Sequence, residues 1–142
     1  MPRYLAIDLG AKRTGLAVGD DETDLAGPVG MVDSHSERLL LWGVRKAVEE
    51  LGPDALVVGV PYDMDGKEGP AAKGAMETAK KIGEHVSLPV HLVDERLSSH
   101  EVEEQLQGRD LTHKGKKVRR DALAAAAILR RFLEQRKEEA AG

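Results

Sequence analysis

Two kinds of hydrophobic pattern alternate along this chain and predict its elements. Residues 4–9 form an apolar run that ends in Asp8-Leu9, and a second β-rich run, 14–19, follows so closely that a hairpin with glycine at the bend is expected. Residues 27–32 would supply a third antiparallel strand, although their glycines and Pro28 argue against a strand there. Residues 55–60 are apolar throughout, as a parallel strand buried on both faces requires.

Apolar residues at helical spacing predict the first helix. Ser34 and Glu37 have the spacing of a capping box, in which two side chains satisfy backbone N–H groups at the start of a helix. The periodic positions then run from Leu39 to Leu51, and Gly52 is a typical residue at which a helix ends.

Further helices and one strand are expected downstream. Pro70 suits the first position of a helix, and Ser98 with Glu101 forms a second capping box. The expected elements are a helix from 70 to about 82, a strand at 90–93, a helix opening at 98, a polar and basic loop at 108–117, and a helix from about 118 to 136. The order predicts an α/β fold: a mixed five-stranded sheet, three antiparallel strands and then two parallel ones, flanked by helices in a single domain over 1–142.

Composition narrows the class of protein. A chain of 142 residues with 41% hydrophobic content suits one domain with a real core. Because there are no cysteines, disulfides, cysteine zinc sites and thiol nucleophiles are excluded. No apolar stretch approaches the roughly 20 residues of a membrane span, and the N-terminal run is too short for a signal peptide, so a cytoplasmic protein that contacts no membrane is expected.

Charge is unevenly distributed. The net charge of −4 argues against a protein that coats nucleic acid by bulk charge. Residues 109–120 nevertheless contain six basic residues and one acid. This run is either a solvated loop or a local surface for a polyanion.

Acidic groups fall where a site is expected. Asp8 ends the first strand, Asp94 and Glu95 end the last, and Asp121 lies in the first turn of the last helix. Ligand sites in such sheets lie beyond the carboxyl ends of the parallel strands. A helical-wheel count places Asp121 inside the apolar arc of its helix, where a carboxylate is costly unless it is paired or binds a cation. Converging carboxylates favour Mg²⁺ or Mn²⁺, and two such ions can cleave a phosphodiester.

Each acid also has a purely structural explanation. Asp8 could cap the turn at Gly10. The pair of Asp94 and Glu95 could form a surface salt bridge with the arginine that follows. Asp121 could be stabilised by the first-turn amides of its own helix.

Four segments together resemble the YqgF family, also called RuvX. They are residues 8–15, residues 59–70, residues 93–99 and residues 121–125, and they follow the family's order over nearly the whole chain. The resemblance implies an RNase H-like fold akin to the RuvC resolvases. It also implies an activity that is described for the family as a pre-16S rRNA nuclease and was earlier described as a Holliday junction resolvase.

Carried over to this sequence, the resemblance implies that Asp8, Glu95 and Asp121 form the catalytic set and bind the metal. Asp94 is a weaker candidate, because neighbours in a strand point to opposite faces. The expected function is metal-dependent cleavage of structured nucleic acid, first of all at the 5′ end of pre-16S rRNA, by a monomer or a homodimer. The side chains expected to hold the substrate backbone are Lys12, Arg13, Arg96, Lys114, Lys116 and Lys117.

Three other functions stay open. They are cleavage of branched DNA, non-catalytic binding of nucleic acid, and a nucleotide-binding ATPase or sugar kinase of the actin and hexokinase type. The last type uses two copies of the fold, whereas this sequence has no internal repeat. Trp42 and Phe132 lie in helical patterns and are expected in the core rather than as platforms for bases, since only 3% of the chain is aromatic.

Overall fold

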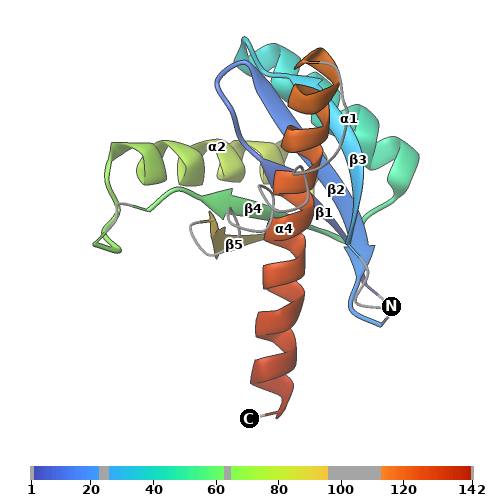
Figure 1. Ribbon diagram of the computed structural model, residues 1–142, viewed down its shortest axis with the longest axis vertical. Helices are drawn as coiled ribbons and strands as arrows, with labels where there is room; N and C mark the ends of the chain where they lie inside the picture. The colour runs from blue at the N-terminus through green and yellow to red at the C-terminus, as the bar shows by residue number, and fades with distance from the viewer. Residues whose placement is uncertain (1, 23–25, 63–64, 96–112, 142) are drawn as a thin grey trace.

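The computed structural model describes the backbone of residues 2–22, 26–62, 65–95 and 113–141, and their side chains except those of residues 26, 113–121 and 141. Strands and helices alternate after an initial run of three strands (Figure 1). In chain order the elements are β1 (Arg3–Asp8), β2 (Arg13–Asp20), β3 (Ala26–Asp33), α1 (Glu37–Leu51), β4 (Ala55–Val60), α2 (Pro70–Val86), β5 (Val90–Asp94) and α4 (His113–Ala141).

The strands form one five-stranded sheet in the order β3-β2-β1-β4-β5. The pairs β1–β2 and β2–β3 are antiparallel, whereas β1–β4 and β4–β5 are parallel. The predicted mixed sheet is therefore confirmed. Pro28 lies in β3, at the edge of the sheet, where its missing N–H costs no central ladder bond.

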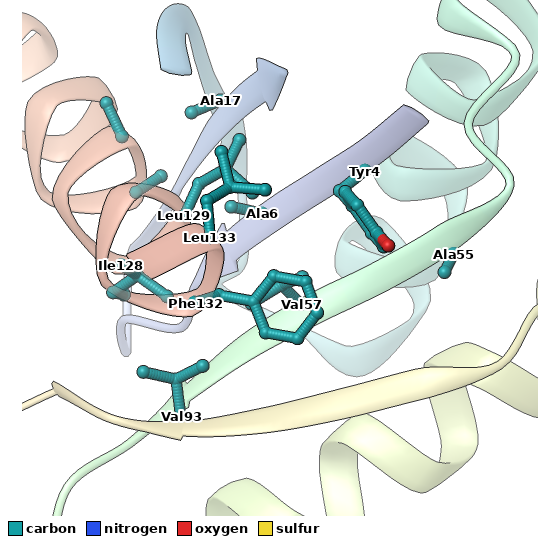
Figure 2. Packing of buried hydrophobic residues seen from close by; sticks show 12 residues of the cluster. Tyr4, Ala6, Ala17, Ala55, Val57, Val93, Ile128, Leu129, Phe132 and Leu133 are labelled. Carbon is teal, nitrogen blue, oxygen red and sulfur yellow. The ribbon is translucent and has the colours of Figure 1, made fainter. Parts of the chain in front are cut away.

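Helices cover both faces of the sheet. Successive strand residues point to opposite faces, so Leu5 and Ile7 of β1 pack with α1 and α2, while Tyr4 and Ala6 pack against α4. All six residues of β4 are buried, which explains its unbroken apolar sequence. Figure 2 shows the α4 side, with Leu129, Leu133 and Phe132 lying over β1 and β4.

The boundaries of α1 and α2 follow the sequence with one correction. Gly52 ends α1 in the left-handed conformation, and Pro70 occupies the first turn of α2. The predicted cap at Ser34 is wrong, because the cap is Ser36, whose Oγ accepts a hydrogen bond from the Leu39 amide at 3.2 Å. Ser34 instead binds the β1–β2 turn, as described below.

The last helix is longer than predicted. It begins at His113 rather than near 118 and ends at Ala141 rather than 136. The lysines at its start and the glutamates and alanines at its end favour helix without showing apolar periodicity, so the pattern underestimates it at both ends. The C-terminal part extends away from the sheet (Figure 1). The helix predicted to open at Ser98 and residues 108–112 of the predicted loop lie outside the described residues, whereas residues 113–117, predicted as loop, are helical.

One core assignment is wrong and another is confirmed. Phe132 is buried, with 6% of its surface exposed. Trp42 has 61% of its surface exposed, because α1 buries Leu40, Val44 and Ala47, and position 42 lies on the opposite side of the helix from these. The apolar run 39–42 contains more hydrophobic residues than one helix face can bury.

None of the helices in the described ranges is both long and apolar enough to cross a membrane.

Candidate active site

Asp8 ends β1 at the edge where the parallel strands have their carboxyl ends. Strand alternation places it on the same face as Tyr4 and Ala6, so it points to the side of the sheet that α4 covers. The side chain is half-buried, and its strand neighbour in β2 is Gly15.

Glu95 directly follows β5, and its side chain forms a hydrogen bond with Asp8. The two strands lie on either side of β4, where the intervening residue at this level is Gly59. A Cβ on Gly59 would lie 3.2 Å from the Cβ of Glu95 and 2.5 Å from the Cδ1 of Ile128 in α4. The absence of a side chain in β4 therefore makes room for the carboxylate and for the close approach of α4.

The surroundings of Glu95 disfavour its negative charge. Burial raises the pKa of its carboxyl group above the usual value, and the nearby charge of Asp94 raises it further, while the hydrogen bond with Asp8 acts in the opposite direction. Two acidic groups that share a hydrogen bond are stable together when one holds a proton or when a cation lies between them.

Asp94 is half-buried and is paired with Val60 of β4. Because residues alternate along a strand, Asp94 and Leu92 face the side of the sheet opposite to Val93. The hydrogen bond with Asp8 is made by Glu95, whereas Asp94 acts on Glu95 through its charge.

The β1–β2 turn is held by its own backbone and by Ser34. The Ser34 hydroxyl donates to the Gly10 carbonyl at 2.7 Å, and the Ser34 amide donates to the Lys12 carbonyl at 2.9 Å. A Cβ on Gly10 would collide with the Arg13 carbonyl oxygen, so the turn requires glycine there. The turn presents Lys12, which is exposed, and Arg13, which is half-buried, beside Asp8.

The remaining predicted residues are described in part or not at all. Asp121, Lys114, Lys116 and Lys117 lie in α4, but their side chains are outside the described part of the chain, as is the whole of Arg96. Within the described side chains, no group of three histidines or acids is placed to hold a metal ion, and Asp8 with Glu95 forms a pair.

The sequence pattern assigned Ser34 to a helix cap and gave Gly59 no role of its own, so it did not predict what either residue does at this site. Both act across long sequence separations, Ser34 on the turn at Gly10 and Gly59 on Ile128. The only local signals were a serine before a helix and a glycine inside an otherwise apolar strand, which often marks a close approach of another chain segment.

Comparison with known proteins gives a consistent picture. The family model for RuvX, described as Holliday junction resolvase, matches residues 2–135. The chain belongs to the RuvX family. A protein of Anaeromyxobacter sp. (strain Fw109-5) named "Putative pre-16S rRNA nuclease" is 37% identical over 94% of this chain and 98% of its own. A protein of the same name from Legionella pneumophila (strain Lens) is 38% identical over 95% and 99%.

The fold of this RuvX family member has a parallel among solved structures. The chain titled "T. thermophilus RuvC in complex with Holliday junction substrate" superimposes with a TM-score of 0.60 and covers 97% of both chains at 15% identity. This likeness shows that the RuvX chain has the RNase H-like fold of RuvC, which confirms the predicted fold class.

Proposed function

We propose that this chain is a metal-dependent endonuclease that processes the 5′ end of pre-16S rRNA in the cytoplasm. The observation that carries the proposal is the hydrogen-bonded pair of Asp8 and Glu95 at the carboxyl edge of the sheet. Placing two acids side by side in a partly buried position opposes folding, and such pairs of perturbed carboxyl groups are typical of functional sites. The names of the relatives from Anaeromyxobacter and Legionella support the RNA substrate.

Asp121 is the proposed third acid. At 3.6 residues per turn, position 121 shares a helix face with positions 125 and 128. Ala125 and Ile128 are both buried on the sheet, and Ile128 lies against Gly59 beside Glu95. Helix α4 runs from the carboxyl ends of the parallel strands toward their amino ends. Position 121, two turns before Ile128 on the same helix face, is therefore expected near the carboxyl ends, where Glu95 lies.

The donor set fits a hard divalent cation. Asp8 and Glu95 supply only oxygen, the chain has no cysteine, and a cation between the two would remove the cost of placing two negative charges together. We assign Asp8, Glu95 and Asp121 as the residues that would hold Mg²⁺ or Mn²⁺. When bound, such an ion polarises a phosphoryl oxygen and activates water.

Basic residues around this edge would hold the nucleic-acid backbone. Lys12 and Arg13 stand on the turn next to Asp8, and that turn is fixed by Ser34. The other proposed contacts are Arg96, Lys114, Lys116 and Lys117. Contacts of this kind position a substrate without reading its sequence.

A branched DNA substrate is the second candidate, because the matching family model is described as a Holliday junction resolvase. The decisive experiment compares purified protein on a 16S rRNA precursor and on a four-way DNA junction, with Mg²⁺ or Mn²⁺. We expect cleavage of the RNA near its 5′ end and little cleavage of the junction. Efficient cleavage of the junction alone would move the assignment to DNA, and cleavage of neither would overturn the nuclease assignment.

Asp8→Asn and Glu95→Gln are expected to lower the cleavage rate by about 1,000-fold, roughly 4 kcal/mol of transition-state stabilisation. Both replacements keep the shape of the side chain, so the fold should be retained. The matched control is Asp94→Asn, which removes a carboxylate from the neighbouring position and should lose much less activity. Equal losses at positions 94 and 95 would contradict the assignment of Glu95.

Binding of metal can be measured without cleavage. Mg²⁺ or Mn²⁺ should raise the Tm of the wild-type protein, because a ligand that binds only the folded state stabilises it. The same addition should have little effect on Asp8→Asn. A similar rise in both proteins would place the metal elsewhere.

A further inference from the structure

The solvent side of α1 carries an exposed aromatic ring among cations. Trp42 has 61% of its surface exposed, and Leu39, one turn earlier, has 42%. Arg38 and Arg45 are one turn before and after Trp42 on the same helix. The Nζ of Lys46 lies 5.8 Å from the centroid of the indole ring. We call these five residues the Trp42 surface.

A cavity of about 540 Å³ opens beside this surface, between α1 and the C-terminal part of α2. Trp42, Leu39, Arg38 and Arg45 line it from α1, and His85 lines it from α2. A concave surface that combines apolar and basic side chains is typical of a binding site rather than of ordinary solvent-exposed helix.

The acids near the Trp42 surface are already neutralised. Glu37, which lines the cavity, pairs with Lys81 at 3.5 Å, and Glu49 pairs with Arg45 at 3.3 Å. Within the described part of the chain, no ion pair is found for Arg38, and Lys46 contacts the ring. The surface therefore presents an aromatic face with net positive charge, which complements an anionic partner that carries flat rings.

We propose that the Trp42 surface binds an unpaired stretch of the nucleic-acid substrate, with one base stacked on Trp42 and the adjacent phosphates held by Arg38 and Lys46. Stacking of bases on aromatic side chains combined with a positively charged track is the general mode by which proteins hold single strands. The inference rests on the proposed function for the class of partner, and it adds a second contact outside the active site.

The cavity beside the Trp42 surface leads toward the β1–β2 turn on the α1–α2 side of the sheet. Glu37 lines both this cavity and a second cavity, of about 410 Å³, which reaches Gly10 and Gly59. Gly10 belongs to the turn next to Asp8, and Gly59 lies against Glu95. Along α1, position 42 is only about 7.5 Å beyond position 37. Asp8 and Glu95 lie on the α4 side of the sheet, so a strand held at both places would cross the edge at the β1–β2 turn before it reaches Trp42.

The chain allows a direct test, because Trp42 is its only tryptophan. Asp8→Asn protein, which retains the surface but should not cleave, is titrated with a short oligouridylate and with a blunt RNA duplex while the indole fluorescence is recorded. We expect the single strand to quench the fluorescence strongly and the blunt duplex to quench it little.

The contribution of each residue to RNA affinity is then measured on variants, from the fluorescence anisotropy of labelled oligouridylate. In the Asp8→Asn background, Trp42→Ala should weaken binding about 10-fold, which lies within the range for loss of one stacked base, and Trp42→Phe should weaken it less. Leu92→Ala is the matched control, since Leu92 is an exposed apolar residue, 45% exposed, on the far edge strand β5. It should bind as the parent does. Arg38→Gln should reduce the salt dependence of binding by about one phosphate contact.

Several results would overturn the inference and leave the proposed function standing. One is single-strand binding without quenching, and another is equal affinity of Trp42→Ala and the parent, while wild-type protein still cleaves the rRNA precursor. A third is a change in sedimentation of Trp42→Ala from dimer to monomer with unchanged RNA affinity, which would assign the surface to a second copy of the chain. If quenching is found but wild type cleaves no RNA, the Trp42 surface stands and the nuclease assignment fails.

Discussion

Helix α4 packs on the sheet at the amino ends and at the carboxyl ends of the parallel strands, and the side chains that it contacts differ between these two ends. Over the amino ends of the strands, the Phe132 ring packs against Tyr4 and His91 with centroid distances of 4.9 and 5.0 Å. Figure 2 shows Phe132 and Tyr4 on this side of the sheet. The guanidinium of Arg136 lies over the rings of Phe132 and Tyr4, 5.5 and 5.9 Å from their centroids. This amino-end cluster of Tyr4, His91, Phe132 and Arg136 fills the interface with large side chains.

The carboxyl end under the same helix holds little apolar volume. One turn before Phe132, Ile128 lies against a glycine, Gly59, and next to the hydrogen-bonded acids Asp8 and Glu95. Charge repulsion and a missing side chain both reduce stability at this end. The comparison indicates that the amino-end cluster holds α4 on the sheet, which permits an arrangement at the other end that suits chemistry better than packing.

The largest expected effect on stability follows from removing the Phe132 ring from the amino-end cluster. Phe132→Ala should lower the free energy of unfolding by about 3–5 kcal/mol, because a buried ring is lost and a cavity remains. Urea denaturation measures this loss. Leu92→Ala, at an exposed position, should change stability by no more than about 0.5 kcal/mol.

The same variant tests whether the two ends are separate. The fraction of Phe132→Ala that is folded should cleave RNA at nearly the wild-type rate, since the acids lie at the other end of the strands. A folded variant without activity would show that the amino-end cluster also positions the active site. The conclusion that the two ends have separate roles would then be wrong.

The contrast also explains how much could be predicted from sequence. The apolar run of β4 and the helical spacing of α1 are local patterns, so the sheet and its helices could be predicted, as could the position of Asp8 at a strand end. Strand alternation also favoured one of Asp94 and Glu95 over the other, and Glu95 is the residue that bonds Asp8.

Features that depend on contacts between distant segments could not be predicted. A glycine in β4 could simply destabilise the strand, or it could make room for another side chain. Gly59 makes room for Ile128, which lies 69 residues later in the sequence, so the choice depends on where α4 packs. Ser34 has the spacing of a cap, but its hydroxyl reaches Gly10 instead. Trp42 belongs to an apolar run of which only part can face the sheet, and periodicity alone did not say which part.

A smaller effect is expected from filling the space at the carboxyl end. Gly59→Ala would bring a Cβ to 2.5 Å from the Cδ1 of Ile128 and 3.2 Å from the Cβ of Glu95, so both must move. We expect a loss of about 1–3 kcal/mol in stability and a larger proportional loss in cleavage, because Glu95 is displaced. Denaturation and cleavage assays on the same preparation separate the two effects.

Ile128→Val provides the compensating change, since it removes the Cδ1 atom that the new methyl group meets. The double variant should regain stability relative to Gly59→Ala, and a double-mutant cycle measures the coupling. Gly74→Ala is the control, because a Cβ there meets nothing within 4 Å and alanine favours the helix interior. Additive effects of the substitutions at 59 and 128 would contradict the close approach of α4 to β4.

The smallest expected effect is a dependence of stability on pH at the amino-end cluster. Burial lowers the pKa of His91, and the positive charge of Arg136 lowers it further. The unfolded chain therefore binds a proton at His91 more readily than the folded chain does, so this residue stabilises the fold above the usual histidine pKa of 6.5 and loses that contribution as the pH falls below it.

Comparison of variants is needed to see this effect, because the raised pKa of Glu95 acts in the opposite sense as the pH falls. The Tm of the wild-type protein should fall between pH 7.5 and pH 5.5. It should fall further than the Tm of His91→Gln over the same range, because that variant lacks the titrating ring. Arg136→Gln should reduce the difference only in part, since burial is the larger cause. If His91→Gln shows the same difference as wild type, the charge of the amino-end cluster has no part in holding α4, and packing of its rings alone accounts for the contrast between the two ends.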